Sequence, residues 1–286
     1  MRIEVRNISF SYNPGQPDEA KILDGISFAV ESGTFTGIIG HTGSGKTTLV
    51  QQLNGLLKPS SGTILAGDAD ITSGKVPMAD IRRKIGLVFQ YPEYQLFEET
   101  VAEDIAFGPR NTGMPEEEIE ARTREAMKLV GLEYEQFAGR SPFELSGGQK
   151  RRAAIAGVLA MKPEVLIMDE PAAGLDPGAH TAILEMIENI RKETGCSIIL
   201  VSHNMDDIGR YCDQVLVLDH GRLVLSGTPD EVFGRAGELA SYGLGLPSGR
   251  ALIRRMQALG AAIPEEGILT EEQAADAIEA WWKEKR

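Results

Sequence analysis

The chain has 286 residues, of which 42% are hydrophobic, which is enough to bury a sizeable core in one large domain or two smaller ones. Its formal net charge of −13 disfavours nucleic acid as the main ligand, because proteins that bind nucleic acid usually present a basic face. The sequence has no apolar run long enough to span a membrane and no signal-peptide pattern, and its two cysteines favour a reducing compartment.

The N-terminal third predicts β-strands that lead into a glycine-rich loop. Alternating runs at 2–12 and 22–30 indicate two strands, separated by a turn at 14–18. A further β-rich run at 34–39 enters the glycine-rich segment, and an apolar-periodic run at 48–53 leaves it. We therefore expect a strand, a loop and a helix in succession.

The glycine-rich segment, residues 40–47, fills every fixed position of the pattern G-x-x-x-x-G-K-[ST]. Its glycines allow consecutive backbone N–H groups to point into one concavity, and the following helix adds the positive end of its dipole. Lys46 places a cation on the outer phosphates, and Thr47 offers a hydroxyl to Mg²⁺. The segment therefore predicts nucleotide binding through Gly40, His41, Thr42, Gly43, Ser44, Gly45, Lys46, Thr47 and Thr48.

The central part of the chain predicts further strands and helices. Residues 63–66 and 85–89 are strand-like, and residues 115–130 predict a helix with Pro115 in its first turn. From residue 148 onward, helices alternate with continuous apolar runs, at 165–168 and 197–201. This rhythm indicates a parallel sheet covered on both faces, and ligands of such sheets bind at the carboxyl ends of the strands.

A second anion-binding device is predicted at residues 145–149, Leu-Ser-Gly-Gly-Gln. Two glycines and a serine at the start of a helix form a nest of backbone N–H groups, and the first turn here adds Lys150, Arg151 and Arg152. We expect phosphate contacts from Ser146, Gly147, Gly148 and Gln149.

The buried run at 165–168 ends in two carboxylates, Asp169 and Glu170. Placing two acids there costs desolvation free energy unless a cation compensates, and Mg²⁺ would do so. We expect Asp169 to hold the metal and Glu170 to act as general base on the attacking water. The alternative is a strand that simply runs out into a solvated acidic turn, and the phosphate-binding loop elsewhere in the chain disfavours it.

The composition changes near 235–249, which we interpret as a boundary. Two helices are predicted beyond it, the first after Ser248 and the second opening with a capping box at 270–273. Trp281 and Trp282 lie near the end of the chain, and a pair of tryptophans normally packs against another apolar surface. Packing on their own domain and burial in a subunit interface both remain open.

The order of these motifs, together with Gln90, the segment Gly-Leu-Asp-Pro at 174–177 and His203, resembles the nucleotide-binding subunit of ABC transporters over residues 1–235. The resemblance implies an α/β fold of the P-loop NTPase, ABC ATPase type, with an antiparallel β subdomain and a helical subdomain at about 91–160. Residues 236–286 would form a small helical C-terminal extension, a candidate dimerisation element. Two subunits would pack head to tail, with the 145–149 loop of one closing over the ATP held by the other.

The resemblance also implies roles for single residues. Tyr12 would stack on adenine; the alternative is that it is an ordinary aromatic residue of a strand, with no role in binding. Gln90 would sense Mg²⁺ and water, Asp176 would connect the two sites of the dimer, and His203 would contact the γ-phosphate. With ATP and Mg²⁺ as cofactors, the implied catalytic residues are Lys46, Gln90, Glu170 and His203, and the implied metal ligands are Thr47, Gln90 and Asp169.

Other positions carry no implied chemistry. His180 and His220 are expected to be structural, as is the side chain of His41, whose backbone alone belongs to the phosphate-binding loop. Ala172 stands where the family often has Thr or Ser, a change that removes no catalytic group.

A finer resemblance is to the energy-coupling factor (ECF) transporter ATPases, which serve cobalt and vitamin importers. It rests on residues 89–97 and 101–109, on the basic residues 150–152, on the C-terminal extension and on the His-Thr pair at 41–42, which is similar to the second of two unlike ATPases. In that family a transmembrane coupling protein sits on the ATPase pair, and a membrane subunit captures a vitamin or a transition-metal ion.

We therefore expect an ATP-hydrolysing subunit of an ECF-type importer, peripheral on the cytoplasmic face of the cell membrane. Its second ATPase would be a paralogue or another copy of itself. Tyr91, Glu93, Tyr94 and Gln95 would line a groove for a helix of the coupling protein, while Leu96 and Phe97 could instead pack inside the helical subdomain.

Three other functions are weighed against this one. A non-transport ABC ATPase of repair or translation is disfavoured, because the chain has neither long heptad regions nor two nucleotide sites. Glu170 and His203 argue against a module that binds nucleotide without turnover, and residues 90–95 argue against an exporter subunit.

Overall fold

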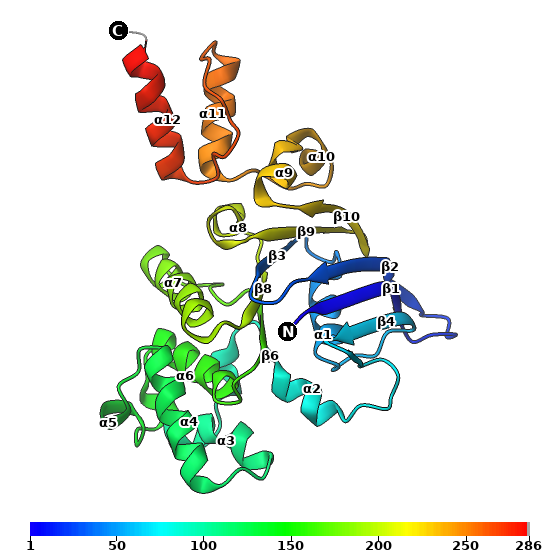
Figure 1. The fold of residues 1–286 in the computed structure, drawn as a ribbon, viewed down its shortest axis with the longest axis vertical. Helices are drawn as coiled ribbons and strands as arrows, with labels where there is room; N and C mark the ends of the chain where they lie inside the picture. The colour runs from blue at the N-terminus through cyan, green and yellow to red at the C-terminus, as the bar shows by residue number, and fades with distance from the viewer. Residues whose placement is uncertain (285–286) are drawn as a thin grey trace.

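The computed structural model describes residues 1–284 and contains two β-sheets with helices around them (Figure 1). The first sheet is antiparallel and has four strands, in the order β2 (Ala20–Val30), β1 (Ile3–Tyr12), β4 (Ser61–Ala66), β5 (Ala69–Asp70). The second has six, in the order β10 (Arg222–Gly227), β9 (Gln214–Asp219), β3 (Phe35–Ile39), β8 (Ser197–Val201), β7 (Val165–Asp169), β6 (Ile85–Val88). The predicted α/β fold with an antiparallel β subdomain is confirmed.

The six-stranded sheet is parallel from β9 to β6, and only the edge strand β10 runs antiparallel to its neighbour. The central strands β7 and β8 are buried and apolar on both faces. Val165 and Ile167 of β7 belong to the core shared with the first sheet and with α1 (Lys46–Leu53), whereas Leu166 and Met168 belong to the core under the helices. The continuous apolar runs therefore do mark strands covered on both sides, as the sequence predicts.

A group of helices forms the lower left of Figure 1, away from the antiparallel sheet. It comprises η1 (Pro92–Gln95), α3 (Val101–Asn111), α4 (Glu116–Leu129), α5 (Tyr134–Phe137), η2 (Pro142–Glu144) and α6 (Gly147–Leu159). Arg151 ties this group to the loop after β7: its guanidinium donates to both carboxylate oxygens of Glu93, at 2.6 and 3.0 Å, and to the carbonyls of Pro171 and Ala173. The group lies within the range predicted for the helical subdomain.

The remaining helices flank the sheets or extend beyond them. They are α2 (Met78–Lys84), α7 (Pro177–Thr194), α8 (Met205–Tyr211), α9 (Pro229–Gly234), α10 (Ala236–Ser241), α11 (Ser248–Ala258) and α12 (Glu271–Glu284). Within residues 1–284, none of the helices combines the length and the apolar character needed to cross a bilayer.

Helices α11 and α12 stand side by side at the top of Figure 1 and have a small core of their own, made of Ile253, Ile263, Ile268 and Ala274. The predicted capping box is present, since Gln273 N donates to Thr270 Oγ1 and Thr270 N donates to Gln273 Oε1. Trp281 packs against this core, whereas Trp282 is 56% exposed. Residues 285 and 286 of the predicted extension lie outside the described residues.

Candidate active site

The phosphate-binding loop joins β3 to α1 and is shaped by glycines. Gly45 precedes α1 with a φ of 99°, in the left-handed region that a side chain disfavours. At Gly40 a Cβ atom would lie 2.3 Å from the carbonyl oxygen of Leu218, so only glycine lets the loop pass this close to β9. The sequence thus folds here into a tight curl directly before a helix N-terminus, the geometry that receives an anion.

Lys46, the first residue of α1, is buried and folds back over the loop. Its Nζ donates to the carbonyl oxygens of Gly40, at 2.8 Å, and His41, at 3.0 Å. Burial lowers the pKa of Lys46, and the carboxylates of Glu170 and Asp169 act in the opposite direction by favouring the charged form. These contacts hold the ammonium group at the loop.

Thr47 and Asp169, which lie far apart in the sequence, meet at the carboxyl end of β7. Thr47 Oγ1 donates to Asp169 Oδ2 at 2.8 Å. Burial raises the pKa of Asp169, and the hydrogen bond from Thr47 offsets part of this effect. A hydroxyl and a buried carboxylate are oxygen ligands of the kind that Mg²⁺ prefers, and a dication would compensate the cost of burying the charge.

Glu170 follows Asp169 with a φ of 50°, an uncommon conformation for a residue with a side chain. Such strain tends to occur at functional sites, where the surrounding structure enforces it. The carboxylate lies between two other predicted residues: Gln90 Nε2 donates to Glu170 Oε2 at 3.2 Å, and His203 Nδ1 lies 3.3 Å from Glu170 Oε1. His203 follows β8, so its proximity comes from the parallel alignment of β7 and β8.

A cavity of about 420 Å³ opens in front of these groups. Its lining includes Lys46, Thr47, Gln90, Asp169 and Glu170, together with loop residues Thr42, Gly43, Gly45 and Thr48. Ile22 of β2 also lines it and was not predicted, because nothing in a strand pattern tells which residue meets a loop formed later in the chain. The structure therefore brings the two halves of the predicted site together at one edge of the sheet.

Several predicted residues lie outside this cavity. Ser146 caps α6, accepting a hydrogen bond from Gln149 N at 3.3 Å, while Gln149 Oε1 accepts one from Ser146 N at 3.0 Å. Gly147 and Gly148 have no atom within 4 Å of the position of a Cβ, so packing within the described chain does not require glycine at either position. The loop at 145–149 thus leads into an exposed N-terminus of α6, at the surface of the helical group.

Two further predicted residues also lie apart. Tyr12 ends β1, with its ring edge-on to Phe10 at 4.8 Å between centroids, and Asp176 caps α7 by accepting from Ala179 N at 3.0 Å. His180 pairs with the buried Asp207 at 2.9 Å, in agreement with the structural role expected for it.

The groove near η1 differs in part from the predicted one. A hollow of about 190 Å³ is lined by Glu93, Tyr94, Leu96, Pro142, Phe143 and Lys150, so Tyr91 and Gln95 do not line it and η2 contributes instead. The reason is that Tyr91, with a φ of 55°, turns the chain back toward Arg151. Leu96 packs on the core of the helical group, whereas Phe97 is exposed against Phe107.

Comparisons with known proteins agree with this arrangement. The family described as "ABC transporter" matches residues 23–173. An energy-coupling factor transporter ATP-binding protein EcfA2 from Clostridium acetobutylicum is 53% identical over 278 residues, covering 97% of each chain. A protein of the same name from Caldanaerobacter subterraneus is 54% identical over 278 residues, covering 97% of this chain and 96% of that protein.

Solved structures give the same result. The structure of cbiO1 from Clostridium perfringens, described as part of the ABC transporter complex cbiONQ, aligns with a TM-score of 0.73 and 41% identity, over 84% of this chain and 93% of that one. The ATP-binding cassette MJ0796, in a dimeric post-hydrolysis state bound to ADP and Pi, aligns with a TM-score of 0.69 and 27% identity, over 79% of this chain and 98% of that one.

Proposed function

Because this chain belongs to the ABC transporter family, as an ATPase of the energy-coupling factor type, we propose that it hydrolyses ATP with Mg²⁺ at the cavity before Lys46 and so energises import through membrane partners. The observation that carries the proposal is the convergence of Thr47, Asp169 and Glu170 beside the phosphate-binding loop. Phosphate release from ATP by the purified chain tests it, since a module that only holds nucleotide would bind ATP and leave it intact.

The chemistry is divided among the residues around the cavity. Lys46 and the backbone N–H groups of the loop would hold the phosphates. Thr47, Asp169 and Gln90 would supply oxygen ligands for Mg²⁺, which would neutralise charge on the phosphates. Glu170 would accept a proton from the attacking water. Gln90 and His203 both contact the Glu170 carboxylate and would orient this carboxylate and the γ-phosphate.

A second subunit is expected to complete the site. Gly147 and Gly148 have no steric reason within the described chain to be glycine, which fits a surface that a ligand on another molecule must approach closely. Ser146, Gly147, Gly148 and Gln149 would then cover ATP held by the partner ATPase, a paralogue or a second copy, and Asp176 would lie between the sites. Tyr12, on the exposed end of β1, would stack on adenine.

The membrane-facing surface would be the groove near η1, on the cytoplasmic face of the membrane. Tyr94 is 84% exposed and Phe143 is also exposed. Two aromatic rings that line one hollow together with Glu93 and Lys150 suit the apolar face and polar edge of one amphipathic helix. We assign this helix to the transmembrane coupling protein. Arg151 pairs with Glu93 and also donates to the carbonyls of Pro171 and Ala173 in the loop after Glu170, so a change at the nucleotide would reach the groove through Arg151.

Replacing both aromatic groups, as Tyr94→Ala with Phe143→Ala, should leave ATP hydrolysis by the isolated chain unchanged and abolish ATP-driven uptake by the assembled importer. Neither side chain lines the ATP cavity, so only the contact with the partner helix is lost. Uptake into vesicles is the measurement, and Tyr94→Phe, which keeps the ring, is the matched control. Normal uptake by the double variant would place the coupling contact elsewhere.

The C-terminal extension would hold the two ATPases together when ATP is absent. It has its own core and exposes Leu252, Leu259 and Trp282 on its outside. Removing residues 248–286 should lower the dimer fraction in sedimentation of the nucleotide-free protein. Because the truncation also removes the buried Arg250, the point variant Leu259→Arg serves as a second test that leaves the core of the extension intact. Dimerisation equal to that of the full chain in both variants would remove this role.

A further inference from the structure

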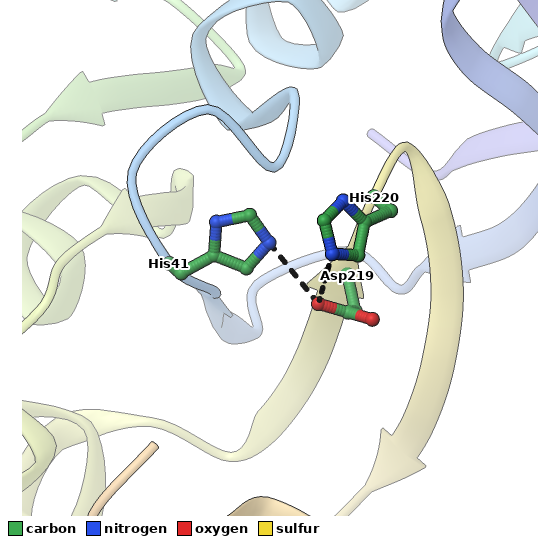
Figure 2. Close-up of side chains that lie close together, drawn as sticks. All are labelled: His41, Asp219 and His220. Carbon is green, nitrogen blue, oxygen red and sulfur yellow. Dashed lines mark ion pairs between the residues drawn. The ribbon is translucent and has the colours of Figure 1, made fainter. Parts of the chain in front are cut away.

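Two histidines and an aspartate gather beside the phosphate-binding loop (Figure 2). They lie on the β9 side of β3, whereas Asp169 ends β7, two strands away on the other side of β3. His41 belongs to the loop, Asp219 ends β9, and His220 lies in the turn to β10. One ligand atom from each residue lies within 4.8 Å of the other two. His41 Nε2 is 3.1 Å from Asp219 Oδ1, and His220 Nε2 is 4.0 Å from the same oxygen.

The hydrogen bonds of His41 fix its tautomer. Its Nδ1 lies 2.7 Å from the carbonyl oxygen of Thr42, which can only accept, so Nδ1 carries the proton. In the neutral ring Nε2 then has a lone pair, and this lone pair faces a carboxylate oxygen. Nε2 is buried and no hydrogen bond satisfies it, because the close contact with Asp219 is misaligned. Two acceptors in this position call for a cation between them.

The turn that carries His220 is a tight hairpin turn and is attached to the phosphate-binding loop. His220 and Gly221 have φ values of 43° and 77°, both positive as in the two-residue hairpin turn of type I′. Gly221 N donates to Ser44 O at 3.1 Å, so the turn is hydrogen-bonded to the phosphate-binding loop. The three side chains therefore come from two segments whose backbones hold each other in place, which pre-organises the cluster.

We propose that His41, Asp219 and His220 form a binding site for a divalent transition-metal ion of the Zn²⁺ or Co²⁺ class. Two imidazole nitrogens and one carboxylate oxygen are ligands that select such ions over Mg²⁺. The N–H···O=C bond from His41 Nδ1 to Thr42 is the outer contact that metal-bound histidines usually make.

The distances fit this assignment with a small adjustment. Ligands about 2.1 Å from a zinc ion are at most about 4.2 Å apart, and the contacts of His41 and of His220 with Asp219 Oδ1 both meet this limit. The three ligand atoms lie within 4.8 Å of one another. The His220 side chain is 82% exposed, so its ring can rotate to bring all three within about 4.2 Å of one another, and an ion can enter from solvent on that side. The site is separate from the oxygen ligands Thr47 and Asp169 and does not depend on the proposed hydrolysis.

The test is a titration of the nucleotide-free full chain with CoCl₂. Binding is measured by calorimetry and by the visible absorption of ligated Co²⁺. We expect one ion per chain. His220→Asn keeps the turn, because Asn-Gly is a preferred pair for type I′, and Asp219→Asn keeps the side-chain shape. Each should weaken binding by at least about tenfold, the lower end of what losing even an outer contact to a metal ligand costs.

The main rival is Co²⁺ bound at the catalytic residues, so His203→Ala is the control and should bind Co²⁺ as the unchanged chain does. Thermal unfolding of each variant checks that it folds. Absence of binding to the unchanged chain would overturn the proposal. Equal binding by His220→Asn and Asp219→Asn, or loss of binding in His203→Ala, would also overturn it.

Discussion

Glu170→Gln is expected to keep ATP binding and to lose hydrolysis by about 10²–10⁴-fold, the usual contribution of a general base. The amide has the size of the carboxylate and can still accept from Gln90, but it cannot take a proton from water. Because ATP would then remain between the two ATPases, the variant should also accumulate as a closed, ATP-loaded dimer. Phosphate release and size-exclusion chromatography with ATP measure the two effects.

A matched control lies at the other end of the same strand. Glu164 directly precedes β7, is about half exposed and pairs at the surface with Lys84, so Glu164→Gln should hydrolyse ATP at the normal rate. Turnover by Glu170→Gln at the rate of the unchanged protein would exclude Glu170 as the base.

Lys46→Ala should weaken ATP binding itself. The ammonium group is the cation nearest to the place of the outer phosphates, and hydrogen bonds to charged groups contribute about 1.5–3 kcal/mol, which corresponds to about 10- to 100-fold in affinity. The variant also leaves the carbonyls of Gly40 and His41 without their present donor, so the empty loop should become less ordered. Equilibrium titration with a fluorescent ATP analogue measures the affinity.

Two further variants, Lys46→Arg and Lys192→Ala, serve as controls for the loss of the positive charge of Lys46. The first keeps the cation and should lose less affinity than Lys46→Ala. The second removes an exposed lysine that pairs with Glu188 on α7 and should leave ATP affinity unchanged. Unchanged ATP affinity in Lys46→Ala, with the protein folded, would count against the assignment of the phosphate-binding loop.

Local patterns were enough to predict the elements that carry the chemistry. The loop at 40–47 and the acidic end of β7 each follow a strand, and strands of a parallel sheet end at one edge, which is why Thr47 and Asp169 meet. The apolar run of β9 and the edge strand β10 were not predicted, although β9 has the same continuous apolar character as β7 and β8.

What the sequence could not show depends on approaches between distant segments. The groove near η1 takes Pro142 and Phe143 from a separate segment that packs alongside it, and no local pattern indicates that neighbour. His41 and His220 were expected to be structural because each stands alone in the sequence. The parallel pairing of β3 with β9 and the hydrogen bond from Gly221 N to Ser44 O bring their segments together.

ATP-driven uptake by the reconstituted importer is the most direct measurement of the central claim. The chain would be purified with the membrane subunits that it binds, these would be identified by mass spectrometry, and the complex would be placed in liposomes with and without this ATPase. We predict that ATP drives accumulation of the labelled cargo only when the chain is present. Failure to bind any membrane partner, or equal uptake in its absence, would contradict the account.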